Sequence, residues 1–293
     1  MCVSTERCAS AVGGFDRSFG WPYAAVVTDD PPVLLTRDAD DPAVVVLTLN
    51  RPARYNALTV ELKSALRASL ALLADADDVQ AAVLTGAGKA FCVGQDLGEH
   101  AEALAADPGS SFNTVVEHYN PIVTELTELP FPTVAAINGP CVGAGLGFAM
   151  ACDLRVAAAG LKLSTAFTGI GLTADSGLSA SLAHAVGVPR AMELLLLNEP
   201  FTSDDALAWG LVRTVVPPED VLGSALELAR RLATGPTKAY VEVRHAVRFG
   251  AVNALPEVLA AEGAAQARLA HTEDHAGAVA DFLAKRKPTF HGK

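Results

Sequence analysis

The chain lacks the composition of several protein classes. It has no basic excess: 22 lysines and arginines stand against 33 aspartates and glutamates, a net charge of −11 over 293 residues. Without a basic cluster, nucleic-acid binding is not expected as its main function. The five cysteines are odd in number and lack metal-ligand spacing, which predicts a reduced protein without a resident metal. With 51% hydrophobic residues, the bulk of the chain is too apolar to be disordered.

The sequence also lacks a clear targeting or membrane segment. Residues 1–30 contain no continuous apolar run, because Arg7, Asp16 and Arg17 interrupt them. We expect this stretch to be a loosely ordered extension. The charge-free run 129–152 is long enough to cross a bilayer, but prolines and glycines divide it into a strand, a turn and a helix start. The sequence therefore predicts a cytoplasmic protein with no membrane partner.

Short β-branched runs alternate with helical segments after residue 30. Strands are predicted at Val44–Leu49, Val79–Thr85, Thr133–Ile137 and Leu154–Ala158. After the first strand, leucines recur every three or four residues from Leu58 to Leu73, which is typical of an amphipathic helix with Thr59 as its N-cap. This order predicts parallel pairing and an α/β core over residues 31–215.

The remaining part of the chain, 216–293, is predicted to be helical. Just before it, Ser203 is expected to cap a short helix that ends at Gly210. Further helices are expected around Val221–Leu232, Pro236–Arg248 and Pro256–Lys285. No linker or repeat separates the two parts, so we expect the helical part to pack on the core.

Two loops have the features of a ligand site. The glycine cluster 143–147 follows a predicted strand and precedes a helical segment at Phe148–Cys152. Phe148 stands where a dinucleotide fingerprint needs glycine, so the cluster predicts either a tight turn or a helix N-terminus with free amides. Such amides can stabilise an oxyanion. A second loop, Ala90–Leu97, follows another strand, and both loops would open at the carboxyl edge of the sheet, where α/β folds bind ligands.

From about Val33 onward, the sequence resembles the enoyl-CoA hydratase/isomerase, or crotonase, superfamily. The matching pieces are Asn50–Pro52 with Asn56–Leu58, Ala90–Leu97, Asn138–Gly139 with the glycine cluster, Cys152–Leu154, Phe201–Val212, Gly235–Thr237 and Phe282–Phe290. The resemblance implies an α/β spiral core of ββα repeats with a helical C-terminal trimerisation part, assembled as a homotrimer or a dimer of trimers. It also implies an enzyme that binds acyl-CoA thioesters and uses no further cofactor.

The resemblance assigns site residues as well. It places the oxyanion donors, a catalytic role, at the backbone amides of Gln95 and Ala144. Contacts to the CoA thioester are implied for Arg54, Val93, Gln95, Asp96, Leu97, Gly143, Ala144, Phe167 and Lys285. For Arg54, an ordinary exposed arginine is an equal alternative to a phosphate contact. Lys285 and Lys287 would meet phosphates from a neighbouring subunit.

The two glutamates of a typical hydratase are missing. They would fall at Gly147 and Phe167, so water addition by the usual pair of carboxylates is not expected. Asp175 is the acid that remains in this region, following a G-L-x-x-D turn that resembles the base of the crotonase isomerases. One carboxylate suffices for isomerisation, because it removes a proton beside the enolate and returns it elsewhere.

Asp175 also has other possible roles: it could cap the next helix, or act as a nucleophile as in the aryl-CoA dehalogenases of the superfamily. The favoured function is isomerisation of a double bond or ring epoxide through an oxyanion-stabilised enolate, with Asp175 as the base. The alternatives are a hydratase with atypical acid–base residues, a hydrolase or dehalogenase using Asp175 as nucleophile, and a catalytically inactive acyl-CoA-binding protein.

Three histidines are weaker candidates. His118 lies in a segment that forms part of the acyl pocket in relatives. It is expected to be a pocket-wall residue, with substrate contact or activation of water as the alternatives. His271 and His275 are four apart but lack the Glu-x-x of a zinc protease between them, so no metal is expected.

Overall fold

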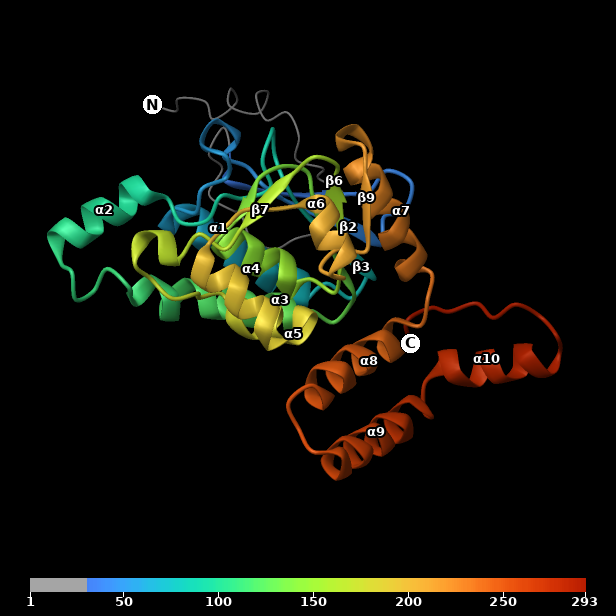
Figure 1. Ribbon diagram of the computed structural model, residues 1–293. Helices are drawn as coiled ribbons and strands as arrows, with labels where there is room; N and C mark the ends of the chain where they lie inside the picture. The colour runs from blue at the N-terminus through green and yellow to red at the C-terminus, as the bar shows by residue number, and fades with distance from the viewer. Residues whose placement is uncertain (1–30) are drawn as a thin grey trace, which may run out of the picture.

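The centre of the molecule is a six-stranded sheet. The computed structural model describes residues 31–293, so the extension predicted for residues 1–30 lies outside the described residues. The strand order is β1-β2-β3-β4-β6-β9, and every neighbouring pair is parallel except β1 and β2 (Figure 1). These strands are β1 (Val33–Arg37), β2 (Val44–Leu49), β3 (Ala81–Gly86), β4 (Thr133–Ile137), β6 (Leu154–Ala158) and β9 (Thr214–Val216). A second, small sheet contains β5 (Cys141–Val142), β7 (Lys162–Ser164) and β8 (Phe201–Thr202).

Helices and shorter helical turns connect the strands. The α-helices are α1 (Val60–Ala74), α2 (Leu97–Ala106), α3 (Asn120–Glu128), α4 (Ala144–Ala151), α5 (Leu178–Leu197), α6 (Ser203–Ala208), α7 (Val221–Ala233), α8 (Thr237–Gly250), α9 (Leu255–Leu269) and α10 (Glu273–Leu283). The shorter segments are 3-10 turns η1 (Pro52–Arg54), η3 (Thr168–Ile170) and η4 (Pro218–Asp220), and the π-helix η2 (Val115–Tyr119).

The sheet is covered on both faces, which explains its continuous apolar strands. Val44 and Val46 of β2 pack with Ala225 of α7 in one buried cluster. Val45 and Leu47 point to the other face, into a cluster shared with α1, α3 and α4. Because alternate residues of a strand face opposite sides, a strand buried on both sides must be apolar throughout.

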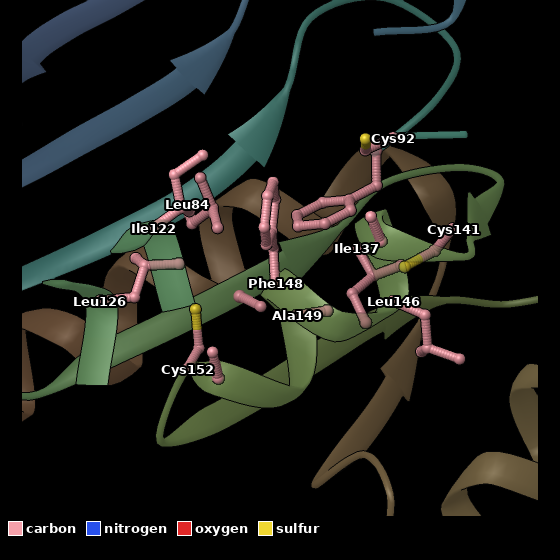
Figure 2. Packing of buried hydrophobic residues seen from close by; sticks show 14 of the residues in the cluster. Leu84, Cys92, Ile122, Leu126, Ile137, Cys141, Leu146, Phe148, Ala149 and Cys152 are labelled. Atoms are coloured by element: carbon pink, nitrogen blue, oxygen red, sulfur yellow. The ribbon is translucent and has the colours of Figure 1, made fainter. Parts of the chain in front are cut away.

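The second cluster positions the glycine-rich helix α4. Figure 2 shows Phe148 of α4 packed among side chains of β3, β4 and α3, including Leu84, Ile122 and Ile137. All of these side chains are almost completely buried. Cys92, on the loop after β3, belongs to the same cluster. The core therefore fixes the start of α4 and the loop after β3 relative to each other.

Most predicted strands are confirmed, whereas several helix boundaries were wrong. β2, β4 and β6 have the predicted bounds, and Thr59 caps α1 by accepting from Leu62 N at 3.2 Å. The short helix α6 is capped by Thr202 rather than Ser203, because Thr202 forms a reciprocal capping box with Asp205. The glycine cluster is not a turn before a helix at Phe148: α4 already begins at Ala144.

The C-terminal helices differ from the prediction in their number and in their packing. The single helix expected over Pro256–Lys285 is two helices, because α9 ends at Leu269 and Thr272 then caps α10 by accepting from His275 N at 3.1 Å. The helical part was expected to pack on the core, but only α7 packs on the sheet, whereas α8 to α10 extend away from it (Figure 1). Arg244 and Arg248 of α8 both pair with Asp153, each at 2.9 Å, and hold α8 to the core.

Helix α5 is long and apolar enough to span a membrane by length and composition alone, the one such helix within residues 31–293. It is not continuous, however, because Gly187 has non-helical backbone angles, φ 75° and ψ 159°. Each piece is shorter than the roughly 20 residues that a bilayer requires. Its exposed apolar side chains include Val188, Met192 and Leu196.

Candidate active site

Two loops meet at the carboxyl ends of β3 and β4. Cys92 and Cys141 form an isolated parallel bridge, and Val142 N donates to the Cys92 carbonyl at 2.9 Å. Phe91 N donates to the Pro140 carbonyl at 3.2 Å. The loop that continues to Gln95 is thus hydrogen-bonded to the segment that leads into α4.

Glycines allow the two loops to approach closely. A Cβ on Gly145 would lie 2.3 Å from the Cys92 carbonyl oxygen, so a larger residue does not fit there. Gly94 has φ +83°, and a Cβ on it would lie 3.5 Å from Ala144 N. Since Gln95 directly follows Gly94, the backbone of Gln95 runs beside the first residue of α4.

The backbone amides of Gln95 and Ala144 are free in this arrangement. On either side of Gln95, Leu58 N donates to the Gly94 carbonyl at 2.8 Å, and Asp96 N donates to the Leu58 carbonyl at 3.1 Å. These bonds turn the Gln95 N–H away from Leu58. Ala144 is the first residue of α4, where amides have no partner within the helix. In the described part of the chain neither amide donates a hydrogen bond, so the pair can stabilise an oxyanion.

A surface hollow of about 460 Å³ opens beside Gln95. It is lined by Ala53, Arg54, Tyr55, Ala57, Val93, Gln95, Asp96, Leu97 and Gly98. Five residues predicted to contact CoA are among them, namely Arg54, Val93, Gln95, Asp96 and Leu97. Arg54 is exposed at this rim. These five residues, which are expected to contact CoA, therefore lie together in the hollow, and they include Gln95, whose backbone amide is free.

Asp96 contributes to this hollow mainly as a structural residue. Its carboxylate caps α2, accepting from Gly98 N at 3.1 Å and Glu99 N at 3.3 Å, and it pairs with Arg51 at 3.2 Å. Burial alone would raise the pKa of this carboxyl, but the backbone amides and Arg51 outweigh burial and lower it. Asp96 is therefore a charged anchor for the loop that carries Gln95.

The other predicted contacts lie in two places. Gly143, the N-cap of α4, donates from its N–H to the Ser164 carbonyl at 3.0 Å. The ring of Phe167 lies 3.9 Å from where a Cβ of Gly143 would be, so both border the oxyanion amides. Lys285 is exposed after α10, outside the lining of the hollow, and its contact stays a prediction.

The position of the first hydratase glutamate has no space for a side chain. A Cβ on Gly147 would lie 2.6 Å from the Ser176 Cβ and 2.9 Å from the Ser176 carbonyl oxygen. The turn at residues 175–176 therefore packs directly on α4. The glutamate side chain of a typical hydratase is therefore absent, and Ser176 occupies the space that it would need.

Asp175 lies in this turn and is partly buried. The Ser176 hydroxyl donates to its Oδ1 at 2.7 Å. Burial raises the pKa of the Asp175 carboxyl, opposed by the Ser176 hydrogen bond and the positive charge of Lys63. The helix-cap alternative is wrong: Gly177 is the N-cap of α5, and Leu178 N donates to the main-chain oxygen of Asp175, not to its side chain. A carboxyl with a raised pKa suits proton transfer near neutral pH.

A buried lysine, which was not among the residues expected from the sequence, also lies at this site. Lys63 of α1 is 0% exposed, and its Nζ donates to Gln95 Oε1 at 3.1 Å and to the Thr114 hydroxyl. Tyr119 OH also donates to Gln95 Oε1, and the Lys63 Nζ lies 4.9 Å from the centroid of the Tyr119 ring. A signal was present, because Lys63 is spaced three residues from Leu66 on the apolar stripe of its helix.

Burial lowers the pKa of Lys63, opposed by the charges of Glu99 and Asp175. His118, on the π-helix η2, is partly buried and lies 3.2 Å from the Thr114 hydroxyl through its Nδ1. Burial and the positive charge of Lys63 lower the pKa of His118, which favours its neutral form. Within residues 31–293 no group of three or more His, Cys, Asp or Glu residues is placed to hold a metal ion.

The fold and this site define an acyl-CoA enzyme of the crotonase fold. A solved structure from Mycobacterium abscessus, assigned as an enoyl-CoA hydratase/isomerase, matches with a TM-score of 0.84 and 46% identity, covering 89% of this chain and 100% of that chain. The chain belongs to the enoyl-CoA hydratase/isomerase family, whose family model matches residues 40–293.

Two relatives indicate the range of reactions in the family. The 1,2-epoxyphenylacetyl-CoA isomerase of Escherichia coli (strain K12) is 37% identical over 251 residues, 85% of this chain and 95% of the relative. A protein assigned as an enoyl-CoA hydratase in Rhodobacter capsulatus is 38% identical with the same coverage. The predicted fold and the acyl-CoA enzyme class are confirmed, while the relatives differ in the reaction they are named for.

Proposed function

We propose that this enzyme isomerises an acyl-CoA thioester, shifting a double bond or opening a ring epoxide through an enolate. The observation that carries the proposal is the place of Asp175, because its turn packs on α4 at Gly147, one helical turn from the Ala144 amide. Asp175 stands there with a raised pKa, while the backbone of Ser176 fills the space at Gly147. A hydratase of the usual kind needs a second carboxylate to activate water.

The proposed reaction is an isomerisation, so the substrate regains one proton for the one that it loses. The N–H groups of Gln95 and Ala144 donate to the thioester oxygen. The Asp175 carboxylate takes a proton from carbon, and the electron pair of the broken C–H bond moves toward the thioester oxygen to form the enolate. For a double-bond shift, the Asp175 carboxyl exchanges its proton with water and then returns a proton to the enolate at another carbon. For a ring epoxide, the C–O bond breaks and the ring oxygen takes the proton. Either way, no net proton is consumed.

Deuterium exchange in an Asp175→Asn variant tests this proposal. In D₂O the wild-type enzyme should introduce deuterium into the acyl chain of a bound enoyl-CoA. Asp175→Asn should lose both exchange and isomerisation by about 10²–10⁴-fold, because the general base is gone. CoA affinity should survive, since the amides and the hollow are unchanged. Asp204→Asn, an exposed isosteric change on α6, is the matched control.

The pH dependence provides a second measurement on the same residue. Because burial raises the pKa of Asp175, kcat/KM should rise with pH through an inflection above the usual aspartate range, as the carboxylate forms. The folded state binds this proton more tightly than the unfolded state does. Wild type should therefore be less stable than Asp175→Asn above that inflection and equal to it at lower pH.

Two outcomes would contradict the base assignment. Unchanged exchange and turnover in Asp175→Asn would remove Asp175 from the mechanism and favour an atypical hydratase or a binding protein. A mass increase on the peptide containing Asp175 after rapid quenching, with ¹⁸O from water left in its carboxylate, would instead establish the covalent alternative.

A further inference from the structure

A buried ammonium in the proposed acyl site has one N–H without an acceptor from the protein. Among the lysines of residues 31–293, Lys63 is the one that is buried. An ammonium has three N–H groups. Gln95 Oε1 accepts one at 3.1 Å, and the Thr114 hydroxyl accepts a second. No other oxygen or nitrogen of the described residues accepts from it, and the Tyr119 ring lies 4.9 Å from Nζ.

The ammonium interacts with two residues, Gln95 and Asp175, that the proposed function places at the reacting end of the substrate. Its partner Gln95 supplies one of the two free amides for the thioester oxygen. On another side it interacts electrostatically with Asp175. An acyl group that reaches from the Gln95 amide to the Asp175 carboxylate therefore passes the Lys63 ammonium.

The charges around Lys63 limit what the acyl group can carry there. The positive charge of Lys63 and the negative charge of Asp175 offset each other, and burial favours a neutral His118. Glu99 already accepts from Val60 N at 3.0 and 3.2 Å. A carboxylate on the acyl group would add a negative charge without a partner. A plain hydrocarbon would leave the third N–H desolvated, without a hydrogen-bond acceptor and with only the face of the Tyr119 ring nearby, which is also unfavourable.

A neutral oxygen satisfies both conditions. We propose that Lys63 is a specificity-determining residue that donates its third N–H to a neutral oxygen on the acyl group, so that the substrates are oxygenated acyl-CoA thioesters rather than plain hydrocarbon ones. The oxygen can be that of a ketone, an ether or an epoxide. The inference rests on the proposed function for the position of the acyl group, between the amides and Asp175.

Binding of unreactive ligands tests this without turnover. Calorimetry would compare hexanoyl-CoA with its 4-oxo, 5-oxo and 6-methoxy derivatives, and with adipoyl-CoA, which carries a carboxylate. Wild type should bind at least one oxygenated ligand about 10- to 100-fold more tightly than hexanoyl-CoA, the range for a hydrogen bond to a charged group. Lys63→Met should lose that preference and bind hexanoyl-CoA at least as tightly as wild type does, because the desolvated ammonium is gone. Lys238→Met, an exposed lysine of α8, should keep the preference.

Three results would overturn the proposal: no oxygenated ligand preferred by wild type, a preference that persists in Lys63→Met, or adipoyl-CoA binding most tightly. If thermal unfolding shows that Lys63→Met does not fold, Lys63→Gln keeps a polar side chain without the charge and should still reduce the preference at least tenfold. A failure here is distinct from failure of the proposed function, because deuterium exchange by Asp175 does not depend on which ligand Lys63 prefers.

Discussion

Replacing Ala144 by proline removes one proposed oxyanion donor but no hydrogen bond within helix α4. Ala144 is the first residue of α4, a position where proline is favoured because its amide has no partner within the helix. Proline restricts the residue before it, but Gly143 has φ 57° and ψ −124°, the mirror image of an extended residue. A glycine adopts that conformation without a Cβ to clash. The variant is therefore expected to fold.

The expected loss follows from the number of donors. One of two amides is deleted, and the Gln95 amide remains on the neighbouring loop. Removal of one such donor costs about 10²–10³ in kcat, or about 2.7–4 kcal/mol of transition-state stabilisation. KM should change little, because the donor acts most strongly on charge that develops during the reaction.

Steady-state kinetics on an isomerisable enoyl-CoA measures this loss, with the melting temperature recorded for each variant. Glu273→Pro is the matched control: it places proline at the first position of α10, after the extended Thr272 with φ −81° and ψ 147°, far from the site. Ala144→Gly keeps the N–H and should lose much less than the proline variant. A folded Ala144→Pro enzyme with turnover close to wild type would refute the role of this amide.

Two further predictions follow from packing. Gly147→Ala forces a Cβ to within 2.6 Å of the Ser176 Cβ, so unfolding measurements should show a loss of about 1–3 kcal/mol and assays a lower turnover, as the Asp175 turn moves. Gly263→Ala on α9, where a Cβ meets nothing within 4 Å, should be neutral or stabilising, and equal behaviour of the two variants would contradict the packing argument. We also propose that further copies of the chain cover the exposed Phe282 and Leu283 of α10, as a homotrimer or a dimer of trimers. Light scattering should then give three or six chain masses, and a monomer would contradict this.

The strands were predictable because their burial dictates their composition. A strand with α7 on one face and α1 on the other has no polar side, and such a run is easily recognised in a sequence. The start of α4 was not predictable in the same way. Glycine is read as a turn signal, yet Gly145 and Gly147 lie inside this helix because Cys92 and Ser176 press against them. Contacts between distant segments overrode local preference there.

The break between α9 and α10 carried a local signal that the hydrophobic pattern obscured. Thr272 is followed by Glu273 and Asp274, an N-cap with an acidic first turn, in the middle of what was expected to be one helix. The oxyanion amides and Asp175 could be located in the sequence only through resemblance to a family. Local patterns leave the glycine cluster open as either a turn or an anion site, and they do not show that Gly94 brings Gln95 beside Ala144.

Lys63 and Asp175 together set the charge of the site during the proposed reaction. Burial raises the pKa of Asp175 and lowers that of Lys63, so burial alone favours the neutral form of each group. The opposite charge of the other group favours the charged form in both cases. When Asp175 takes the proton, its negative charge passes to the thioester oxygen held by Gln95 and Ala144. Lys63 interacts with Asp175 and is hydrogen-bonded to the Gln95 side chain, so the cation is close to the negative charge both before and after the transfer. The net charge of the buried site does not change, and the chain can therefore keep a desolvated lysine beside a desolvated carboxylate.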